Sequence, residues 1–421
     1  MSDSLFSALT KLKGNPRACV FTEPLWGLSM NLCIPYLSVY MLALGLSDTS
    51  IGFIVTVNTV SQIIFSFLSG PITDKTGRRK TTAIFDIIAW CIPGLIWWRA
   101  EGFWFFLAAA LLNGAQAVTT NSWTCLLIED AEKKQITRIF SLTTACGQFS
   151  AFFAPISAVL ISRLTLVPAI RVLFLNAFIL MLIKVIILYF ASKETGIGKK
   201  RLLETRDMNL FQITSGYGGV IKTILRSRGM VFSIVIAALA FIVQTLNNAF
   251  WQIIVNKKLL VHESILPFFM VLRSFLAIIF LFFVIPKLSK GILKAPLLLG
   301  FAAYFIGQGI LILVPVDGWI KYPLLCVSLV FDGFGLGILT MLSESLIALH
   351  VDPNERARIL AIRFMIVMMV TAPFGWIGGI LSDISRNLPF VLNMAILAAG
   401  IAITLAHYHR ESSGHLKEAE Q

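Results

Sequence analysis

Long apolar runs alternate with short polar interruptions over the whole chain. Most runs are near 20 residues long. A helix of that length rises ~1.5 Å per residue and therefore spans a hydrocarbon core of ~30 Å. Backbone groups in lipid need partners within their own segment or in a closed barrel, and the strict alternation of a barrel is missing. The pattern predicts an all-α membrane protein with twelve transmembrane helices, at about 19–44, 51–72, 81–99, 103–128, 138–163, 168–192, 229–256, 264–286, 295–315, 321–350, 357–385 and 388–408.

The longest polar interruption, residues 193–228, divides these spans into six plus six. Each half also contains an Arg-Ile pair followed by a long apolar run that ends on Ala-Pro, at 138–155 and at 358–373. Such a recurrence is typical of transporters built from internal repeats. We therefore predict two pseudo-symmetric six-helix bundles, 1–192 and 229–421, joined by a cytoplasmic linker over 193–228.

Composition agrees with a membrane protein and limits its partners. Hydrophobic residues make up 57% of the chain and charged residues 14%, against roughly 25% charged in globular domains. The net charge of +13 comes from Lys and Arg concentrated in every second connection, which predicts cytoplasmic termini by the positive-inside rule. Nucleic acid is therefore not an expected partner. Short loops favour the plasma (inner) membrane of a prokaryote, and the cysteine and histidine spacings predict no metal or cofactor.

The stretch SGPITDKTGRRK, residues 69–80, is a polar segment between spans two and three. Gly70 removes a side chain where a helix approaches a neighbour closely. Asp74 lies at the membrane edge, where a carboxylate can meet the positive N-terminus of another helix. Gly77 provides a permissive turn residue. A charged turn that only obeyed the positive-inside rule would need the basic residues alone, without this register.

That register, Gly-x-x-x-Asp-Lys-x-Gly-Arg-Arg-Lys, closely resembles the signature of the major facilitator superfamily, which also has six plus six spans. The resemblance implies a secondary transporter that works by alternating access. It also implies that Asp74 caps the eleventh helix, near 354–356, and that basic residues of the motif reach Glu129 or Asp130. The predicted conformational latch comprises Gly70, Asp74, Lys75, Gly77, Arg78, Arg79, Glu129 and Asp130. Drug–proton antiporters of the family carry an arginine early in span four, and this span has none.

Charged residues inside spans are candidates for function. Asp332 in span ten and Arg273 in span eight lie at similar predicted depth. Either they pair, as a switch or as a permanent structural ion pair, or Asp332 carries a coupling proton while Arg273 holds an anionic or hydroxylated substrate. Glu344 and Arg363, also at equal depth, are expected to form a structural or gate pair.

Three further charged residues are expected to be structural. Glu23 stands between Thr22 and Pro24, a sequence typical of a helix start. Asp86 and Lys184 lie on spans three and six, which the resemblance places at the periphery, and Lys184 can snorkel to the interface.

Uncharged polar residues inside spans predict a cavity for a small polar solute. Span seven has amides and a tryptophan at helical spacing, so they share one face. Interhelical hydrogen bonding is the structural alternative. The predicted substrate-binding residues are Asn31, Tyr36, Asn58, Gln62, Asn113, Gln116, Trp123, Gln148, Gln244, Asn247, Asn248, Trp251 and Arg273.

The sequence has no nucleotide-binding, hydrolase or zinc motif, so we do not expect an enzyme. The leading hypothesis is a monomeric, proton-coupled symporter for a hydroxylated solute such as a sugar or glycoside. The alternatives are a proton-coupled exporter of drug-like or amphiphilic compounds, and a lipid flippase or sensor on the same fold. The expected partners are a small-molecule substrate, H⁺ and membrane lipids.

Overall fold

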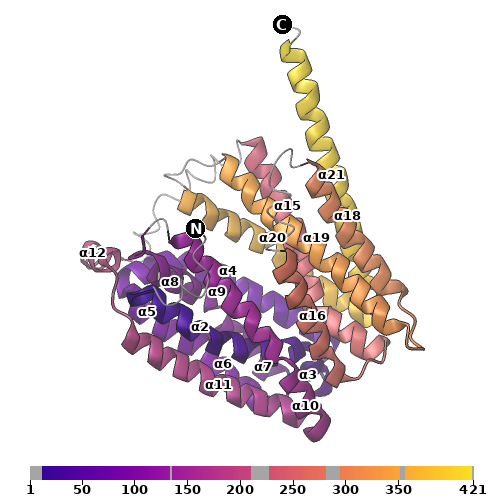
Figure 1. Ribbon diagram of the computed structural model, residues 1–421, viewed down its shortest axis with the longest axis horizontal. Coiled ribbons are helices and arrows are strands. Elements are labelled where there is room, and N and C mark those ends of the chain that lie inside the picture. The colour runs from indigo at the N-terminus through magenta and orange to yellow at the C-terminus, as the bar shows by residue number, and fades with distance from the viewer. Residues whose placement is uncertain (1–11, 133–134, 210–226, 281–293, 351–355, 420–421) are drawn as a thin grey trace, which may run out of the picture. The chain divides into compact units, whose positions relative to one another are not determined.

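The computed structural model describes residues 12–132, 135–209, 227–280, 294–350 and 356–419. Every regular element in these ranges is helical, as Figure 1 shows, and the predicted all-α fold is confirmed. In the described residues, 11 helices are long and apolar enough to cross a membrane. The remaining predicted span, 264–286, begins as α16 (Leu266–Ile279), and its last residues lie outside the described ranges.

The chain divides into two compact units. The first comprises Met1–Leu46, Phe53–Gly216 and Glu263–Val271. The helices of this unit are α2 (Gly14–Cys33), α3 (Leu37–Ala43), α4 (Asp48–Thr76), α5 (Arg78–Asp86), α6 (Ile92–Trp98), α7 (Phe103–Asn113), α8 (Gln116–Ile128), α9 (Ile136–Ser150), α10 (Pro155–Leu164), α11 (Leu166–Ala191) and α12 (Gly196–Glu204). Short 3₁₀ segments join α2 to α3 and α9 to α10, and a π-helical segment, η2 (Ile87–Cys91), joins α5 to α6.

Two helix pairs position the residues described below. Helix α2 packs along α11, and α5 packs against α8. The buried core between these elements includes Val20 from α2, Leu127 from α8 and Leu188 from α11. Because apolar burial contributes about 25 cal/mol per Å², these contacts hold spans one, four and six together.

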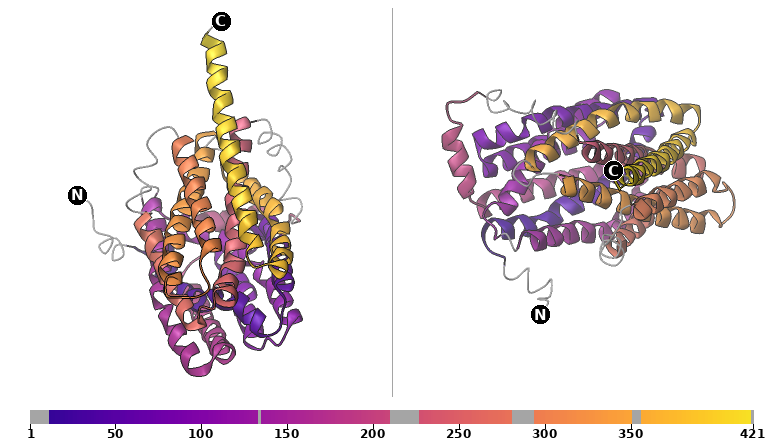
Figure 2. Two further views of the ribbon diagram at one scale, coloured as in Figure 1. Left: turned by 90° about the vertical axis from the view of Figure 1, so that its right-hand side faces the viewer. Right: turned by 90° about the horizontal axis from the view of Figure 1, so that it is seen from above.

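The second unit comprises Ser47–Gly52, Tyr217–His262 and Leu272–Gln421. Besides the part of α16 from Leu272 onward, this unit contains the helices α15 (Arg228–Ile253), α18 (Lys294–Leu313), α19 (Lys321–His350), α20 (Arg356–Ile384) and α21 (Leu388–Ala419). Helix α18 packs against α19 and α21, and α15 packs against α19 and α20. The C-terminal turns of α21, yellow in Figure 2, extend beyond the other helices of this unit.

The expected helix start at Glu23 is wrong. Helix α2 begins at Gly14 and runs through Pro24 to Cys33. Proline removes one backbone donor from a helix, and nearby the Thr22 hydroxyl donates to the Ala18 carbonyl oxygen at 2.9 Å. Apolar residues before position 23 pack against α8, α9 and α11, and this tertiary packing outweighs the local helix-start signal. Glu23 consequently lies in the middle of a span.

Candidate functional site

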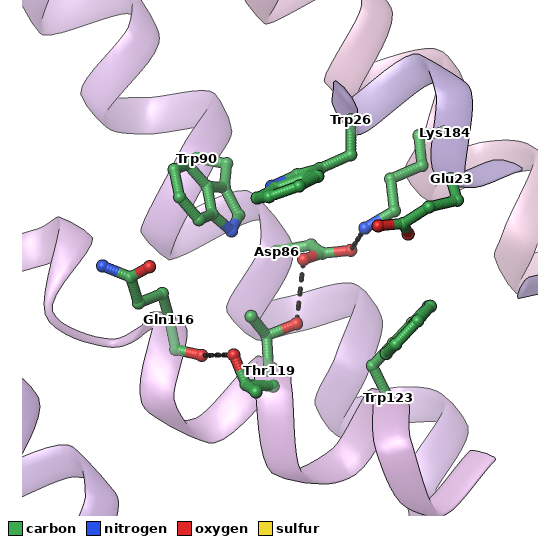
Figure 3. Close-up of a pocket in the computed structure, with 9 residues that line it drawn as sticks. Glu23, Trp26, Asp86, Trp90, Gln116, Thr119, Trp123 and Lys184 are labelled. Atoms are coloured by element: carbon green, nitrogen blue, oxygen red, sulfur yellow. Dashed lines mark hydrogen bonds and ion pairs between the residues drawn. The ribbon is translucent and has the colours of Figure 1, made fainter. Parts of the chain in front are cut away.

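A cavity of about 190 Å³ lies inside the first unit. Helices α2, α5, α8 and α11 and the π segment η2 each contribute side chains to it (Figure 3). Its lining combines three charged groups, three indoles and three uncharged polar side chains: Glu23, Trp26, Asp86, Trp90, Gln116, Thr119, Thr120, Trp123 and Lys184.

A buried ion pair forms one wall of the cavity. The Lys184 ammonium lies 2.8 Å from an oxygen of the Asp86 carboxylate, and the two side chains are 5% and 2% exposed. The other Asp86 oxygen accepts a hydrogen bond from the Thr119 hydroxyl at 2.8 Å. The expected snorkelling of Lys184 is wrong, because a carboxylate inside the bundle supplies its partner. Asp86 and Lys184 neutralise one another.

Glu23 is the unmatched charge of the cavity. Its side chain enters from α2, near Lys184 on α11, as Figure 3 shows. Its carboxylate makes no hydrogen bond or ion pair with any residue in the described ranges. With all three groups ionised the cavity carries one surplus negative charge. A partly buried charge without a partner is unfavourable, so the site is complementary to a cation.

Indole rings surround the charged groups. The Trp26 and Trp90 ring centroids are 5.9 Å apart with their planes at 81°. Asp86 lies between this pair and Trp123 in the view of Figure 3. The Trp123 Nε1 atom is buried and has no hydrogen-bond partner among the described residues. Trp90 belongs to η2, and π-helical turns inside α-helices are frequent at functional sites.

Most of the predicted amides of spans two and four form a hydrogen-bonded chain instead of lining the cavity. Gln62 donates to Asn58 at 2.7 Å, and Asn58 donates to Asn113 at 3.2 Å. Gln116 also donates to the Asn113 side-chain oxygen, at 3.1 Å. These bonds link α4, α7 and α8, which is the interhelical role left open by the sequence. Gln116 and Trp123 are the predicted residues that line this cavity.

Two predicted residues of span one are engaged in packing. Asn31 donates to the Gly27 carbonyl oxygen at 2.8 Å, within its own helix. Tyr36 is 1% exposed, and its hydroxyl accepts a hydrogen bond from Ser157. Gln148, the predicted residue of span five, lies on α9, and its side chain is not among those that the structure describes.

The polar stretch between spans two and three forms a network around one buried guanidinium. Arg78 is 4% exposed and donates to both oxygens of Glu129, at 3.0–3.1 Å. It also donates to Asp74 at 2.9 Å. The expected contact between the motif and Glu129 is therefore present. The expected partner of Asp74 lies near 354–356 on the eleventh helix, where residues 354 and 355 and the side chain of Arg356 are not described. Within the first unit Asp74 meets Arg78 and, at 3.9 Å, Arg201.

The two glycines of this stretch differ. Gly77 has φ +87°, and a Cβ there would lie 2.7 Å from a Glu194 side-chain oxygen, so the predicted permissive turn is present. Among the described residues of the first unit, a Cβ at Gly70 would meet no atom within 4 Å. The close helix approach expected at Gly70 therefore has no partner within this unit and stays a prediction.

The beginning of the predicted linker belongs to the same network. Glu194 accepts hydrogen bonds from the backbone N–H groups of Arg78 and Arg79 at 3.0 and 3.1 Å, and so caps α5. The Thr195 hydroxyl donates to Glu129. The Lys75 ammonium donates to the carbonyl oxygen of Met208 at 2.7 Å.

Two further predicted latch residues contact this part of the chain. Arg79 lies 4.0 Å from the Tyr189 ring centroid, near the end of α11. Asp130 accepts hydrogen bonds from the Gly196 backbone and the Asn15 side chain. Residues 193–208 thus fold onto the motif. The sequence reveals little of this, because the contacts join positions more than 60 residues apart.

We expect Glu194→Ala to lower the unfolding midpoint of the purified protein by about 2–8 °C. Losing a helix cap costs about 1–2 kcal/mol, and 1 kcal/mol shifts the midpoint by about 2–4 °C in a unit of this size. Thermal unfolding in detergent measures the effect. Glu204→Ala, at an exposed ion pair with Arg201, is the matched control and should shift the midpoint by under about 1 °C. Equal midpoints for both variants would contradict the capping role.

The second unit contains a buried polar network centred on Asp332. Both carboxylate oxygens accept hydrogen bonds from Gln308 at 2.9 Å. Asn247 donates to the Tyr304 hydroxyl at 2.9 Å and to Asp332 at 3.5 Å. Asn393 donates to Gln308 at 2.9 Å. The side-chain oxygens of Asn247 and Asn393 are buried and accept no hydrogen bond from a described residue.

The other predicted residues of this unit lie in different surroundings. No ion pair within 4.0 Å joins Arg273 to Asp332 among the described residues, so neutral amides hold the carboxylate in place of the predicted direct pair. On α15, Asn248 is exposed and Gln244 half-buried, whereas Trp251 is buried. Arg363 donates to the Ser343 hydroxyl at 3.2 Å, and the side chain of Glu344 lies outside the described ranges.

The sequence was compared with known families and structures. Residues 25–319 match the family model described as Major Facilitator Superfamily, which covers more than half of the chain. The chain belongs to the major facilitator superfamily. It is accordingly an integral multi-pass membrane protein, in agreement with its 11 candidate spans in the described residues.

Individual members of the superfamily resemble the chain to different extents. Over 131 residues it is 27% identical to the uncharacterized MFS-type transporter YqjV of Bacillus subtilis (strain 168), a match that spans 31% of this chain and 32% of that protein. The nucleoside transporter NupG has a TM-score of 0.71 at 14% identity, covering 94% of this chain and 98% of that one. A POT family transporter in complex with 5-aminolevulinic acid has a TM-score of 0.70 at 14% identity, covering 93% and 95%. At such identities these structures show the fold alone.

Most of the residues that line the cavity were not predicted as site residues from the sequence. Glu23, Asp86 and Lys184 were expected to be structural, and Trp26 and Trp90 were not singled out. A signal was nevertheless present: Glu23 precedes Trp26 by three positions and Asp86 precedes Trp90 by four, spacings that put an acid and an indole on one helix face.

Proposed function

We propose that the protein is a proton-coupled secondary transporter that moves a small, ring-bearing organic cation by alternating access. The cavity of the first unit is its substrate site, and Glu23 is the residue that binds the positive charge. The observation that carries this proposal is the Glu23 carboxylate, which has no hydrogen bond or ion pair among the described residues and lies beside three indoles. It favours the exporter of drug-like compounds among the alternatives that the sequence left open.

The chemistry of the lining supports a cation over a neutral solute. A cation over an indole face gains about 0.5–2 kcal/mol, and Trp26, Trp90 and Trp123 each present such a ring. A carboxylate about 4–5 Å from a cation adds about 3–4 kcal/mol at an effective dielectric constant near 20. The Asp86–Lys184 pair has no net charge, so it leaves this preference unchanged.

A hydroxylated solute such as a sugar is the second candidate. The Gln116 amide group lies in the lining, where it offers a planar donor and acceptor for hydroxyl groups, and an indole can cover the apolar face of a sugar ring. The two candidates differ in what they require. The cation needs the charge of Glu23, whereas the sugar needs the hydrogen bonds of Gln116.

Transport into proteoliposomes tests the proposal. Purified protein is reconstituted, and uptake of radiolabelled 1-methyl-4-phenylpyridinium, a flat monovalent cation, is compared with uptake of methyl β-glucoside. We expect saturable uptake of the cation that collapses with a protonophore, and no saturable uptake of the glucoside. Saturable uptake of the glucoside alone would replace the first candidate with the second, and uptake of neither would reject both.

Asp332 is the proposed proton carrier of the second unit. Asp332 is 7% exposed, and the direct partners of its carboxylate among the described residues are the neutral amides of Gln308 and Asn247. Buried acidic residues inside membrane spans serve as proton relays in transporters. The amides of Gln308 and Asn247 fix the orientation of the carboxyl group, and the unused oxygen of Asn247 is an acceptor available to its protonated form.

In the Asp332→Asn variant we expect cation exchange to persist and accumulation driven by a pH gradient to disappear. Asparagine preserves the shape of the side chain but cannot carry a proton. A gradient of one pH unit corresponds to about 1.4 kcal/mol, which supports about tenfold accumulation for one proton per cation. The measurement is uptake with and without an imposed gradient. Asp317→Asn, in an exposed loop, is the control and should behave like the wild type. Tenfold accumulation of the cation by Asp332→Asn would disprove the assignment of Asp332 as the proton carrier.

A further inference from the structure

A second concave site lies on the outside of the first unit, between the beginning of α2 and the end of α11. Its volume is about 410 Å³. Six of its lining residues follow one face of α2 and two come from α11: Gly14, Arg17, Ala18, Phe21, Thr22, Leu25, Ile187 and Ala191. It lies apart from the cavity of the proposed substrate site, with which it shares no lining residue.

The groove is apolar along its length and basic at one end. Phe21 is 56% exposed and Ile187 is 46% exposed, and both lie on candidate membrane spans. Arg17 lies near the N-terminal end of α2, and its guanidinium carbon is 5.6 Å from the Phe21 ring centroid. Arg17 makes no ion pair with any residue in the described ranges.

Two exposed lysines extend the basic end. Lys13 immediately precedes α2. Lys193 follows α11 by two residues, and Asn15 holds its backbone by two hydrogen bonds, of 2.8 and 2.9 Å, beside the start of α2. The nearby acid Asp130 already has each carboxylate oxygen bound, by Asn15 and by the Gly196 backbone.

The first turn of α2 adds to this positive end. Helix α2 has 20 residues, and among the described residues no side chain caps its N-terminus. Backbone N–H groups at a helix N-terminus favour anions through the helix dipole. A phosphate near Arg17 would therefore meet two lysines, one arginine and the positive end of the helix dipole, while an attached acyl chain would continue over Phe21 and Leu25.

We propose that this groove binds one anionic glycerophospholipid. The lipid phosphate and its anionic headgroup contact Arg17, Lys13 and Lys193, and one acyl chain lies along Phe21, Leu25 and Ile187. Zwitterionic lipids have the same acyl chains but carry a compensating positive charge that these residues repel. Basic pockets between transmembrane helices bind anionic headgroups for this reason. The site is independent of the proposed transport activity.

Native mass spectrometry of the full-length protein tests the proposal. Protein stripped of lipid is exposed to equal amounts of phosphatidylglycerol and phosphatidylcholine with identical acyl chains. We expect the wild type to retain one phosphatidylglycerol in preference to phosphatidylcholine by at least about fivefold, the contribution of roughly one basic residue near a membrane surface. Equal retention of the two lipids would overturn the proposal.

Two variants locate the effect. Arg17→Gln should reduce the preference about fivefold, because it removes one of the three basic contacts, which contributes about 1 kcal/mol. Arg99→Gln is the matched control: Arg99 is also exposed and lies 5.6 Å from an indole centroid, that of Trp98, at the far end of another span. It should retain the full preference. An unchanged preference in Arg17→Gln, or an equal loss in Arg99→Gln, contradicts the assignment.

Inorganic phosphate distinguishes a lipid site from a simple phosphate site. At millimolar concentration it should leave the retained phosphatidylglycerol in place, because the acyl chain contributes about 0.8 kcal/mol per buried CH₂ that free phosphate lacks. Complete displacement by phosphate would show that the groove plays no part in binding. Ala191→Trp, which fills the groove from α11, should reduce lipid retention while leaving Arg17 in place.

Discussion

In the Glu23→Gln variant, saturable uptake of 1-methyl-4-phenylpyridinium is expected to fall at least about tenfold. A tenfold change corresponds to about 1.4 kcal/mol, which is below the ~3–4 kcal/mol of a carboxylate–cation contact at an effective dielectric constant near 20. Glutamine keeps the size of the side chain and removes its charge. Glu23 has no hydrogen bond or ion pair among the described residues, and the nearby Lys184 keeps its ion pair with Asp86, so the substitution breaks no direct contact.

The readout is the initial rate of uptake over a range of cation concentrations, together with the elution profile of the purified variant. The expected result is loss of uptake with a normal profile. Glu101→Gln, an exposed acid in the connection between α6 and α7, is the matched control and should transport like the wild type. Wild-type kinetics in Glu23→Gln would show that the cavity does not bind the cation through this residue.

The Lys184→Met variant is expected to lose about 3–5 kcal/mol of folding free energy, because it leaves the buried Asp86 carboxylate without a counter-charge. The ion pair at 2.8 Å is nearly inaccessible to solvent, so loss of Lys184 leaves the Asp86 carboxylate without the counter-charge that offsets its desolvation. Replacing both partners with apolar residues, as in Asp86→Leu/Lys184→Met, should recover most of this loss. The measured quantity is the fraction of monodisperse protein that remains after heating.

Lys200→Met provides the comparison at the surface. Lys200 pairs with Glu204 at 3.8 Å, and the two side chains are 78% and 43% exposed. Exposed pairs contribute about 0–1 kcal/mol, so the same substitution should have little effect there. Equal heat sensitivity of Lys184→Met and Lys200→Met would mean that burial of the first pair does not determine stability.

The transmembrane helices could be predicted from the sequence because each depends on the composition of its own segment. A run such as 168–192 is apolar along its whole length and needs no partner to be recognised as a span. The motif around Arg78 could also be predicted in part, since its register is local. Its contact with Glu129 then followed from the resemblance to the superfamily.

The cavity could not be predicted in the same way, because its lining comes from four spans far apart in sequence. Glu23 lay beside a proline, and local rules favoured a helix start there. Asp86 and Lys184 are 98 positions apart, so nothing in their neighbourhoods indicated that each satisfies the other. Glu194 likewise acts on a helix 115 positions before it. These are consequences of tertiary packing, which periodicity does not encode.

Direct binding of the cation to purified protein tests the central claim, that the first unit holds a substrate through Glu23 and its indoles. Isothermal titration with 1-methyl-4-phenylpyridinium should give one site per chain in the wild type. It should give at least about tenfold weaker binding in Glu23→Gln and in Trp90→Leu, and near-normal binding in Trp90→Phe, which keeps an aromatic face. Equal affinities across these four proteins, or tight binding of methyl β-glucoside in place of the cation, would contradict the account.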